Sequence, residues 1–382
     1  MYLCRLLQIY SFVSVRSGLS HHGFSGGWME SLSSRNYSSK FKNLISKAFI
    51  KADSVFARIQ LDTERLRIIK MDHIYNDCLA CPKKGGTQFL CLDGCFTSSR
   101  LASKGKEQIP LFDSHYILHD IKHTQNYKTT KTDDNNCSTI FKATIETKSK
   151  YDKLEETGHF GIACAIHEIL LKMVDMKNGE SFKYPDHLLK NHFISRELPD
   201  KLFLYYDVMC RYKPHIIKNN ILPEKLVPNT HFLIGQFHVL PHGALCIDTM
   251  QPYTTPGNGF VDGEALERRW AFFRNHIHSI KQMTAQNRAI FLDRLVWWEY
   301  KTQTNQIVDR IIKKSQKCFK DLELYRLFNF KDFQISKEKP VDFININQSN
   351  LNETQISILS KIESISYDYE TQKIFMSQKV RN

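Results

Sequence analysis

Three acidic residues that follow or begin predicted elements could together bind divalent metal ions. Asp93 follows a short apolar, β-prone segment, residues 87–92, and Asp207 follows a second one, residues 202–206. Glu264 lies in the first turn of a predicted helix. Mg²⁺ and Mn²⁺ prefer oxygen ligands of this kind. Two such ions about 3.5 to 4 Å apart can activate the attacking oxygen and stabilise the leaving oxygen of a phosphodiester. The three carboxylates therefore indicate cleavage or strand transfer of nucleic acid.

Three other carboxylates are alternatives to this set. Glu267 lies one helical turn after Glu264 and faces the same way. We favour Glu264 because the start of the helix can place it beside the strand ends. Asp175 also follows an apolar run and is an alternative second ligand, although an aspartate there more often caps a turn. Asp262 is interpreted as the helix cap rather than a ligand.

The cysteines suggest a separate, structural metal site. Cys78 and Cys81 have the Cys-x2-Cys spacing of half a zinc site, and structural zinc needs four nitrogen or sulfur ligands. The remaining ligands stay open among Cys91, Cys95, Cys137, Cys164, His167, Cys210, His238, His242 and Cys246. No cysteine has a visible activating His-Asp partner, so a cysteine nucleophile is disfavoured.

The net charge favours a polyanionic partner. The chain has 53 Lys and Arg against 40 Asp and Glu, a formal charge of +13. This charge argues against a small-molecule hydrolase and for DNA. The predicted DNA contacts follow the last acidic residue and are Arg268, Arg269, Arg274, Lys281 and Arg288. The alternative is that Trp270, Phe273, Ile277 and Ile280 form a buried helix face and leave these basic residues solvated.

The elements that must position these residues are strands alternating with helices. Residues 158–176 predict a strand pair joined by a turn near His167, and residues 180–189 predict a helix. Residues 102–157 are polar and predict a long connection. From Gly263 a long helix is predicted, with breaks near Gln286. No stretch approaches the roughly 20 apolar residues of a membrane-spanning helix, so no membrane partner is expected.

Four regions are expected along the chain. Residues 1–40 form an irregular leader, 41–74 a helical lead-in, 75–305 the catalytic domain, and 306–382 a helical or partly disordered C-terminal extension. The first 50 residues contain six basic and one acidic side chain and many serines. That composition also resembles an organellar presequence, which is the alternative to an irregular leader.

Seven segments, taken in order over about 230 residues, resemble the transposase domain of the Kyakuja-Dileera-Zisupton group. They are Cys78–Pro82; Leu92–Phe96 with Arg100; Thr157–Gly161 leading to Cys164 and His167; Asp175–Met176 with Gly179–Glu180; Tyr206–Cys210 with His215; Phe237–His238 with His242 and Cys246; and Gly257–Glu264 with Glu267–Arg268 and Trp270. The resemblance implies an α/β fold, a ribonuclease-H-like mixed sheet flanked by helices, with an insertion before the C-terminal catalytic helix.

The resemblance also implies an activity and its partners. It implies a cut-and-paste transposase of the Asp-Asp-Glu type, in which Asp93, Asp207 and Glu264 match the three acids and bind Mg²⁺ or Mn²⁺. The expected partners are transposon ends and target DNA, the expected compartment is the nucleus, and a homodimer is expected because two ends must be brought together. A structural Zn²⁺ at Cys78 and Cys81 is a further expectation. The alternative is a catalytically inactive or truncated DNA-binding protein that retains the fold.

Overall fold

The computed structural model describes residues 2–31, 39–69, 78, 80–82, 85–104, 117–118, 137, 153–177, 179–194 and 196–326. The chain divides into two compact units, Met1–Thr304 and Asn305–Asn382. The described part of the second unit is essentially one helix, α12 (Ile307–Arg326). All the candidate site residues lie in the first unit.

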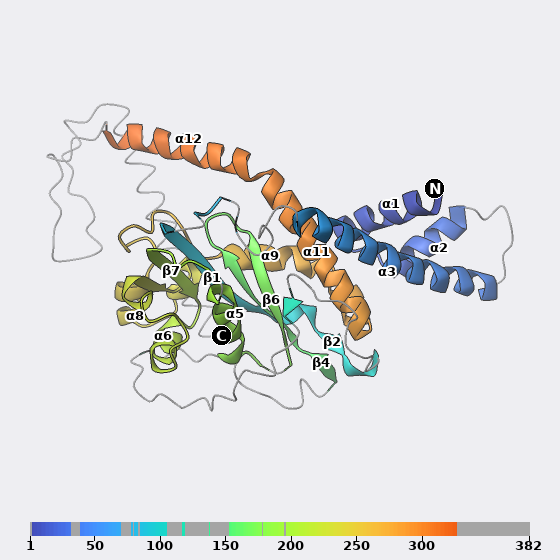
Figure 1. Ribbon diagram of the computed structural model, residues 1–382, viewed down its shortest axis with the longest axis horizontal. Helices are drawn as coiled ribbons and strands as arrows, with labels where there is room; N and C mark the ends of the chain where they lie inside the picture. The colour runs from blue at the N-terminus through green and yellow to red at the C-terminus, as the bar shows by residue number, and fades with distance from the viewer. Residues whose placement is uncertain are drawn as a thin grey trace. The chain divides into compact units, whose positions relative to one another are not determined.

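A mixed β-sheet forms the centre of the first unit (Figure 1). Its strand order is β3-β6-β5-β1-β7-β8. Five strands have four residues or more, namely β6 (Leu170–Met176), β5 (Gly158–Cys164), β1 (Thr87–Cys95), β7 (Lys201–Tyr206) and β8 (Thr230–Leu233), and β3 (Ile117–Leu118) adds a two-residue edge. β1, β7 and β8 run parallel, whereas β5 is antiparallel to both β1 and β6. β2 (Arg100–Leu101) and β4 (Leu154–Glu156) form a second, two-stranded sheet.

Helices cover both faces of the central sheet (Figure 1). The helices after β6 are α5 (Lys183–Phe193), α6 (Met209–Lys218), α7 (Gln236–Val239), α8 (Ala244–Met250), α9 (Ala265–Arg274), α10 (Ile277–Lys281) and α11 (Ala285–Asn305). Because side chains alternate along a strand, Cys91 and Tyr205 share one face, and they pack there with Trp270 of α9. Phe160 and Tyr206 share the other face, where their rings contact each other.

Burial on both faces explains why these segments are strands. All seven residues of β5 are buried, and β7 is buried from Leu202 to Tyr206. Strands buried on both sides are expected to be continuous apolar runs rather than alternating ones. The two apolar segments that precede Asp93 and Asp207 fit this pattern.

Several sequence predictions are confirmed here and others are corrected. The strand pair over residues 158–176 with its turn near His167 is confirmed, as is the mixed α/β class. β1 continues to Cys95, so Asp93 lies within the strand and not after it. The long helix predicted from Gly263, with breaks near Gln286, is divided into α9, α10 and α11 by breaks at residues 275–276 and 282–284, and only the second of these lies near the predicted place. Most of residues 102–157 lies outside the described residues.

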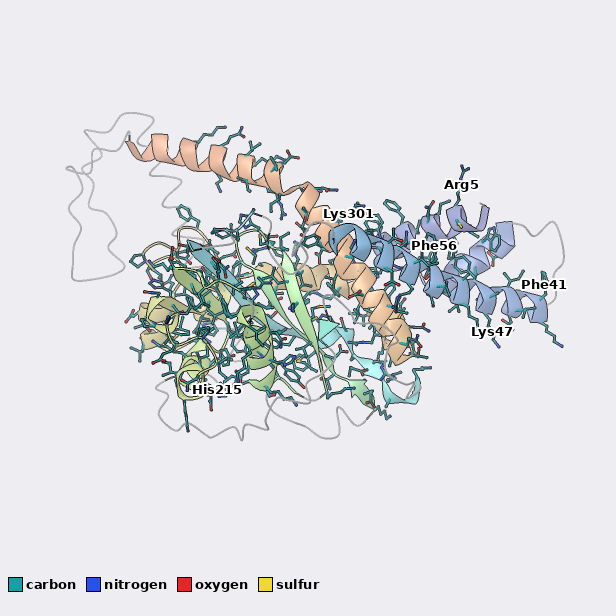
Figure 2. The ribbon with its side chains drawn as sticks, in the orientation of Figure 1. Arg5, Phe41, Lys47, Phe56, His215 and Lys301 are labelled. Carbon is teal, nitrogen blue, oxygen red and sulfur yellow. The ribbon has the colours of Figure 1, made fainter. Side chains whose placement is uncertain are left out.

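The irregular leader predicted over residues 1–40 is also corrected. The structure has α1 (Tyr2–Ser17) and α2 (His21–Ser31) there, followed by α3 (Ser39–Ile69). Tyr10 and Phe49 are buried where these helices pack together. Arg5 and Lys47 project away from them into solvent (Figure 2). A sequence rich in serine and arginine can therefore be helical where a few apolar side chains share one face.

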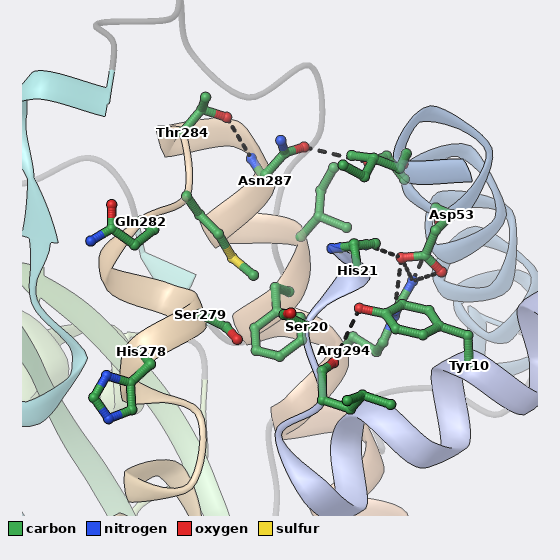
Figure 3. A pocket seen from close by; sticks show the side chains of 16 residues that line it. Tyr10, Ser20, His21, Asp53, His278, Ser279, Gln282, Thr284, Asn287 and Arg294 are labelled. Atoms are coloured by element: carbon green, nitrogen blue, oxygen red, sulfur yellow. Dashed lines mark hydrogen bonds and ion pairs between the residues drawn. The ribbon is translucent and has the colours of Figure 1, made fainter. Parts of the chain in front are cut away.

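A buried ion pair joins α3 to α11. Both oxygens of the Asp53 carboxylate accept hydrogen bonds from Arg294 at 3.1 and 3.2 Å, and one also lies 3.0 Å from His21 Nε2 (Figure 3). These residues line a pocket of about 480 Å³. Within the described ranges, no helix combines the length and apolar character needed to cross a bilayer.

Candidate functional site

Asp93 and Asp207 lie side by side on neighbouring strands. β1 and β7 are parallel, and Leu92 of β1 is paired with Tyr206 of β7. The residue after each of these is an aspartate, so the two aspartates lie at the same edge of the sheet. Both aspartates share the strand face that α9 covers, because they are two residues beyond Cys91 and Tyr205. Trp270 Nε1 of α9 donates a hydrogen bond to Asp93 Oδ2 at 2.7 Å. The indole therefore fixes one carboxylate at this edge.

Glu264 approaches the two aspartates from the start of α9. It is buried, and its carboxylate accepts a hydrogen bond from the backbone N–H of Phe237 at 3.0 Å. A Cβ at Gly235 would lie 2.3 Å from Glu264 Oε1, so only glycine leaves room for this carboxylate. Asp262 Oδ1 accepts the backbone N–H of Glu264 at 2.9 Å, but the N-cap of α9 is Glu264, so the prediction of Asp262 as the helix cap is corrected.

His238 connects Glu264 with Asp207. Its Nδ1 lies 3.1 Å from Glu264 Oε2 and its Nε2 lies 3.2 Å from Asp207 Oδ2. Glu267 Oε1 is further away, 3.9 Å from His238 Nε2, and its side chain is 46% exposed. Asp93, Asp207, Glu264 and Glu267 line one cavity of about 10 Å³, close to the space of a single water. The structure thus brings the three predicted acids together and leaves Glu267 beside them.

The carboxylates at this edge ionise less readily than ordinary ones. Burial, together with the charges of Asp207 and Glu180, raises the pKa of Asp93 well above its usual value. Burial and the charge of Glu264 raise the pKa of Asp207 to about 7, even though His238 acts in the opposite direction. Burial works against the charged form of His238, but its hydrogen bond with Glu264 and the charge of Asp207 outweigh it and raise its pKa to about 9. Crowded negative charge of this kind is relieved by a cation.

Glu180 is an additional acid that the sequence did not single out as a site residue. It is buried, it accepts a hydrogen bond from the hydroxyl of Tyr206 at 2.6 Å, and burial raises its pKa to about 7. A Cβ at Gly94 would lie 3.1 Å from its Oε2, so this glycine allows Glu180 to approach β1. The only signal in the sequence was its place within one of the resembling segments. Asp175, by contrast, is paired with Arg288 at 2.8 Å and does not join the site.

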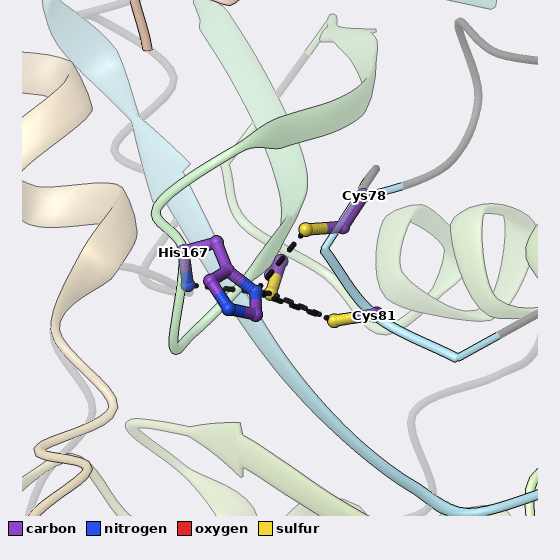
Figure 4. Close-up of side chains that lie close together, drawn as sticks. Cys78, Cys81 and His167 are labelled. Carbon is purple, nitrogen blue, oxygen red and sulfur yellow. Dashed lines mark hydrogen bonds between the residues drawn. The ribbon is translucent and has the colours of Figure 1, made fainter. Parts of the chain in front are cut away.

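Cys78 and Cys81 lie beside Cys164, the last residue of β5, and His167, in the turn between β5 and β6 (Figure 4). We call Cys78, Cys81, Cys164 and His167 the first cluster; their ligand atoms all lie within 4.8 Å of one another. His167 Nδ1 is 3.2 Å from Cys78 Sγ and 3.4 Å from Cys81 Sγ. Ligands bound at 2.0 to 2.3 Å to a tetrahedral zinc lie roughly 3.3 to 3.8 Å apart. The first cluster therefore could hold a metal ion such as zinc.

The described residues also contain a second cluster, Cys137, Cys210, His242 and Cys246, whose ligand atoms lie within 4.8 Å of one another. Each of these residues was a zinc-ligand candidate in the sequence. Their grouping was not predicted, because none is part of a Cys-x2-Cys pair. Of the other candidates, Cys91 is buried in the core and His238 belongs to the acidic site.

The predicted DNA contacts divide into buried and accessible residues. Arg269 and Arg288 are buried, with Arg269 paired to Glu299 at 2.8 Å and Arg288 to Asp175, so their prediction as phosphate contacts is corrected. Their guanidinium groups balance one buried carboxylate, Glu299, and one half-buried carboxylate, Asp175. Arg268 is 38% exposed and paired with Asp262 and Glu168. Arg274 is exposed and Lys281 is half-buried, so both stay candidates for DNA contacts.

Comparison with protein-family models shows which family this chain belongs to. The sequence model of the Kyakuja-Dileera-Zisupton transposase matches residues 87–297. The chain belongs to this family. No curated protein and no solved structure matches it.

The family match confirms the resemblance drawn from the ordered segments and shows which features lie within it. Asp93, Asp207 and Glu264 all fall inside the matched residues, as does the second cluster. Cys78 and Cys81 of the first cluster precede the match. A transposase-related function therefore applies to the part of the chain that contains the acidic site.

Proposed function

We propose that this chain is a cut-and-paste DNA transposase of the Asp-Asp-Glu type, which cleaves and joins DNA phosphodiester bonds with Asp93, Asp207 and Glu264. One observation carries the proposal: two aspartates lie next to each other at the carboxyl ends of parallel strands, and His238 links one of them to a buried glutamate. Family membership supports the same activity.

The fold proposed for this activity is ribonuclease-H-like. In that fold the first acid lies on the first strand, the second on a neighbouring later strand, and the last on a helix packed on the sheet. Here Asp93 lies on β1, Asp207 directly after β7, and Glu264 directly before α9, which packs on β1 and β5. Residues 234–264, between β8 and α9, correspond to the expected insertion before the catalytic helix. The proposed domain covers residues 75–305, preceded by a lead-in and followed by the C-terminal extension.

The donor set fits hard divalent cations. Asp93, Asp207 and Glu264 offer carboxylate oxygens around one small cavity, and burial and mutual repulsion hold the pKa values of Asp93 and Asp207 high. Mg²⁺ or Mn²⁺ bound there would supply an activated attacking oxygen and a stabilised leaving oxygen. Asp93 and Asp207 would hold the ions most directly, because they share one edge of the sheet.

The neighbouring residues position these ligands. Trp270 orients Asp93, and the backbone N–H of Phe237 orients Glu264. The imidazole of His238 lies between Asp207 and Glu264. Its raised pKa keeps it protonated there, so it balances part of their negative charge. A cation that binds these carboxylates takes over that role, so cation binding and the proton on His238 compete.

We also propose a structural zinc ion in the first cluster. Three thiols and one imidazole form a closed set of four ligands, which is typical of structural rather than catalytic zinc. The proposed ion would join the segment before β1 to the end of β5. The proposed DNA partners are transposon ends and target DNA, with a homodimer to hold two ends and action in the nucleus, where that DNA resides.

Cleavage of DNA by the purified full chain tests the proposed activity. Supercoiled plasmid is incubated with the protein and Mn²⁺ or Mg²⁺, and nicked product is measured on gels. We expect metal-dependent nicking that is lost in Asp93→Asn, Asp207→Asn and Glu264→Gln. Glu224→Gln, an exposed change away from the site, serves as the matched control and should cleave normally.

Two results would decide against this assignment. DNA binding without cleavage by the unaltered protein would favour a catalytically inactive DNA-binding protein. Loss of cleavage in Glu267→Gln but not in Glu264→Gln would transfer the third acid to Glu267, one turn further along α9. In each case circular dichroism must show that the variant is folded.

A further inference from the structure

The second cluster has the composition and spacing of a metal site in its own right. Cys137 and Cys246 are buried, and Cys210 and His242 are half-buried. His242 Nδ1 lies 3.3 Å from Cys137 Sγ and 3.7 Å from Cys210 Sγ. These distances match the roughly 3.3 to 3.8 Å between ligands of one tetrahedral zinc ion. Three thiols and one imidazole are also a soft ligand set that selects zinc over magnesium.

The four ligands come from separate parts of the chain. Cys210 is in the first turn of α6, Cys246 is in α8, and His242 lies in the turn between α7 and α8. Cys137 belongs to the long connection between β3 and β4. Buried and half-buried thiols gathered from three such segments have no evident role in the core, since apolar side chains would fill the same space without polar groups. A shared metal ion accounts for their convergence.

The second cluster is linked to the acidic site at two points. Cys210 lies three residues after Asp207, and the His242 imidazole also hydrogen-bonds to the backbone of Asp207. His242 in turn follows His238 by four residues. A metal-bound histidine commonly uses its second nitrogen for such a hydrogen bond, which fixes both partners. An ion here would therefore hold the backbone of Asp207 and the segment that presents His238.

We propose that Cys137, Cys210, His242 and Cys246 bind a structural zinc ion that positions Asp207 and His238 at the acidic site. The zinc site stands on its own geometry. The positioning role rests on the proposed function, because it assumes that Asp207 binds a divalent ion.

Zinc content tests the site directly. The purified full chain is analysed by inductively coupled plasma mass spectrometry, and two zinc ions per chain are expected, one for each cluster. Cys246→Ser and Cys81→Ser should each lose one ion and the double variant both, while Cys4→Ser, an exposed cysteine outside both clusters, should keep two. Two zinc ions retained in Cys246→Ser would overturn the proposal.

A conservative variant covers the case in which Cys246→Ser does not fold. His242→Cys keeps four ligands, so it should keep two ions, and after cobalt substitution its sulfur-to-cobalt absorption should increase by one thiolate. An unchanged cobalt spectrum would show that residue 242 is not a ligand and would overturn the proposal.

Mn²⁺ affinity tests the positioning role without measuring catalysis. Free Mn²⁺ is followed by electron paramagnetic resonance in the presence of the full chain. Cys246→Ser should weaken Mn²⁺ binding about tenfold, the size typical of lost support for a metal ligand. Cys81→Ser is the matched control, because Cys164 of the first cluster pairs with Leu90 of β1 and not with Asp93. It should change Mn²⁺ affinity less than twofold.

The outcomes separate the two proposals. Equal weakening in Cys246→Ser and Cys81→Ser would indicate general destabilisation and overturn the positioning role. If the unaltered chain binds no Mn²⁺, the proposed function and the positioning role both fail, whereas the zinc count still decides the second cluster.

Discussion

Two groups of acids in the first unit have different partners. Asp207 and Asp93 lie at the carboxyl ends of β7 and β1, and within the described residues neither has an arginine or lysine within ion-pair distance. Asp175 lies near the carboxyl end of β6 and is paired with Arg288. Glu156 of β4 is paired with Arg100 and with Lys177.

A strand-end aspartate is therefore not enough to identify a metal ligand. Asp175 and Asp207 both follow buried apolar runs, yet the first is neutralised by a permanent cation and the second only by a histidine. A guanidinium already neutralises the charge of its carboxylate partner, so a metal ion would stabilise that carboxylate only a little further. The acids that lack such a partner are the ones available to bind one.

The largest expected difference between the two groups is in DNA cleavage. Asp207→Asn removes a proposed metal ligand and should reduce Mn²⁺-dependent nicking by about 10³-fold or more, because the ions supply several kcal/mol of transition-state stabilisation. Asp175→Asn should stay within about tenfold of the unaltered rate. Initial rates of plasmid nicking measure both. Equal losses in the two variants would remove the distinction.

The free energy of unfolding should depend strongly on the ion pair between Asp175 and Arg288. Arg288→Gln leaves Asp175 without its buried partner and should lower the free energy of unfolding by about 3 to 5 kcal/mol. Arg274→Gln, on the exposed side of α9, should change it by less than about 0.5 kcal/mol. Urea unfolding followed by tryptophan fluorescence measures both variants. An Arg288→Gln protein as stable as Arg274→Gln would show that the ion pair is not structural.

The two groups should respond oppositely to pH in the absence of divalent ions. The pKa of Asp207 is raised to about 7, so the folded state keeps a proton between about pH 4 and 7 that the unfolded state loses, and stability falls as pH rises through this range. His238, with a pKa raised to about 9, adds stability below about pH 6.5 that is lost as pH rises through 9.

Glu156 acts in the other direction. Burial opposes its ionisation, but hydrogen bonds from Arg100 and Lys177 outweigh burial and lower its pKa, so its contribution is lost as pH falls below the usual glutamate value. Unfolding free energies measured at pH 5, 6, 7 and 8 test the predicted fall in stability with rising pH. This dependence on pH should be weaker in Asp207→Asn. Added Mn²⁺ should stabilise the protein most at high pH. A Mn²⁺ effect independent of pH would contradict the raised pKa of Asp207.

The smallest expected effect concerns DNA affinity. If exposed Arg274 contacts a phosphate, Arg274→Gln should weaken DNA binding evenly across sequences and reduce the slope of log K against log salt by about 1. Fluorescence anisotropy with a labelled duplex between 50 and 200 mM salt measures this slope. An unchanged slope would place the DNA path elsewhere on the molecule.

Much of the fold was predictable because it depends on local patterns. The apolar runs over residues 87–92 and 202–206 identified β1 and β7, and the small-residue pattern around His167 identified the β5–β6 pair. The helix break at residues 275–276 and the helices α1 and α2 were not predicted. Their positions depend on which apolar side chains meet a partner, such as Tyr10 against Phe49, and a local pattern does not contain that information.

For the candidate site, the sequence alone predicted the family, through seven short segments in order, and three acids as its expected metal ligands. The partners of each acid and the grouping of the cysteines follow from the tertiary structure instead. Asp175 and Arg288 are 113 residues apart, and Cys78 and His167 are 89 apart. Contacts at such separations follow from strand register and helix packing, which are properties of the whole chain. For this reason strand-end aspartates that are alike in sequence became a structural ion pair in one case and a proposed metal ligand in the other.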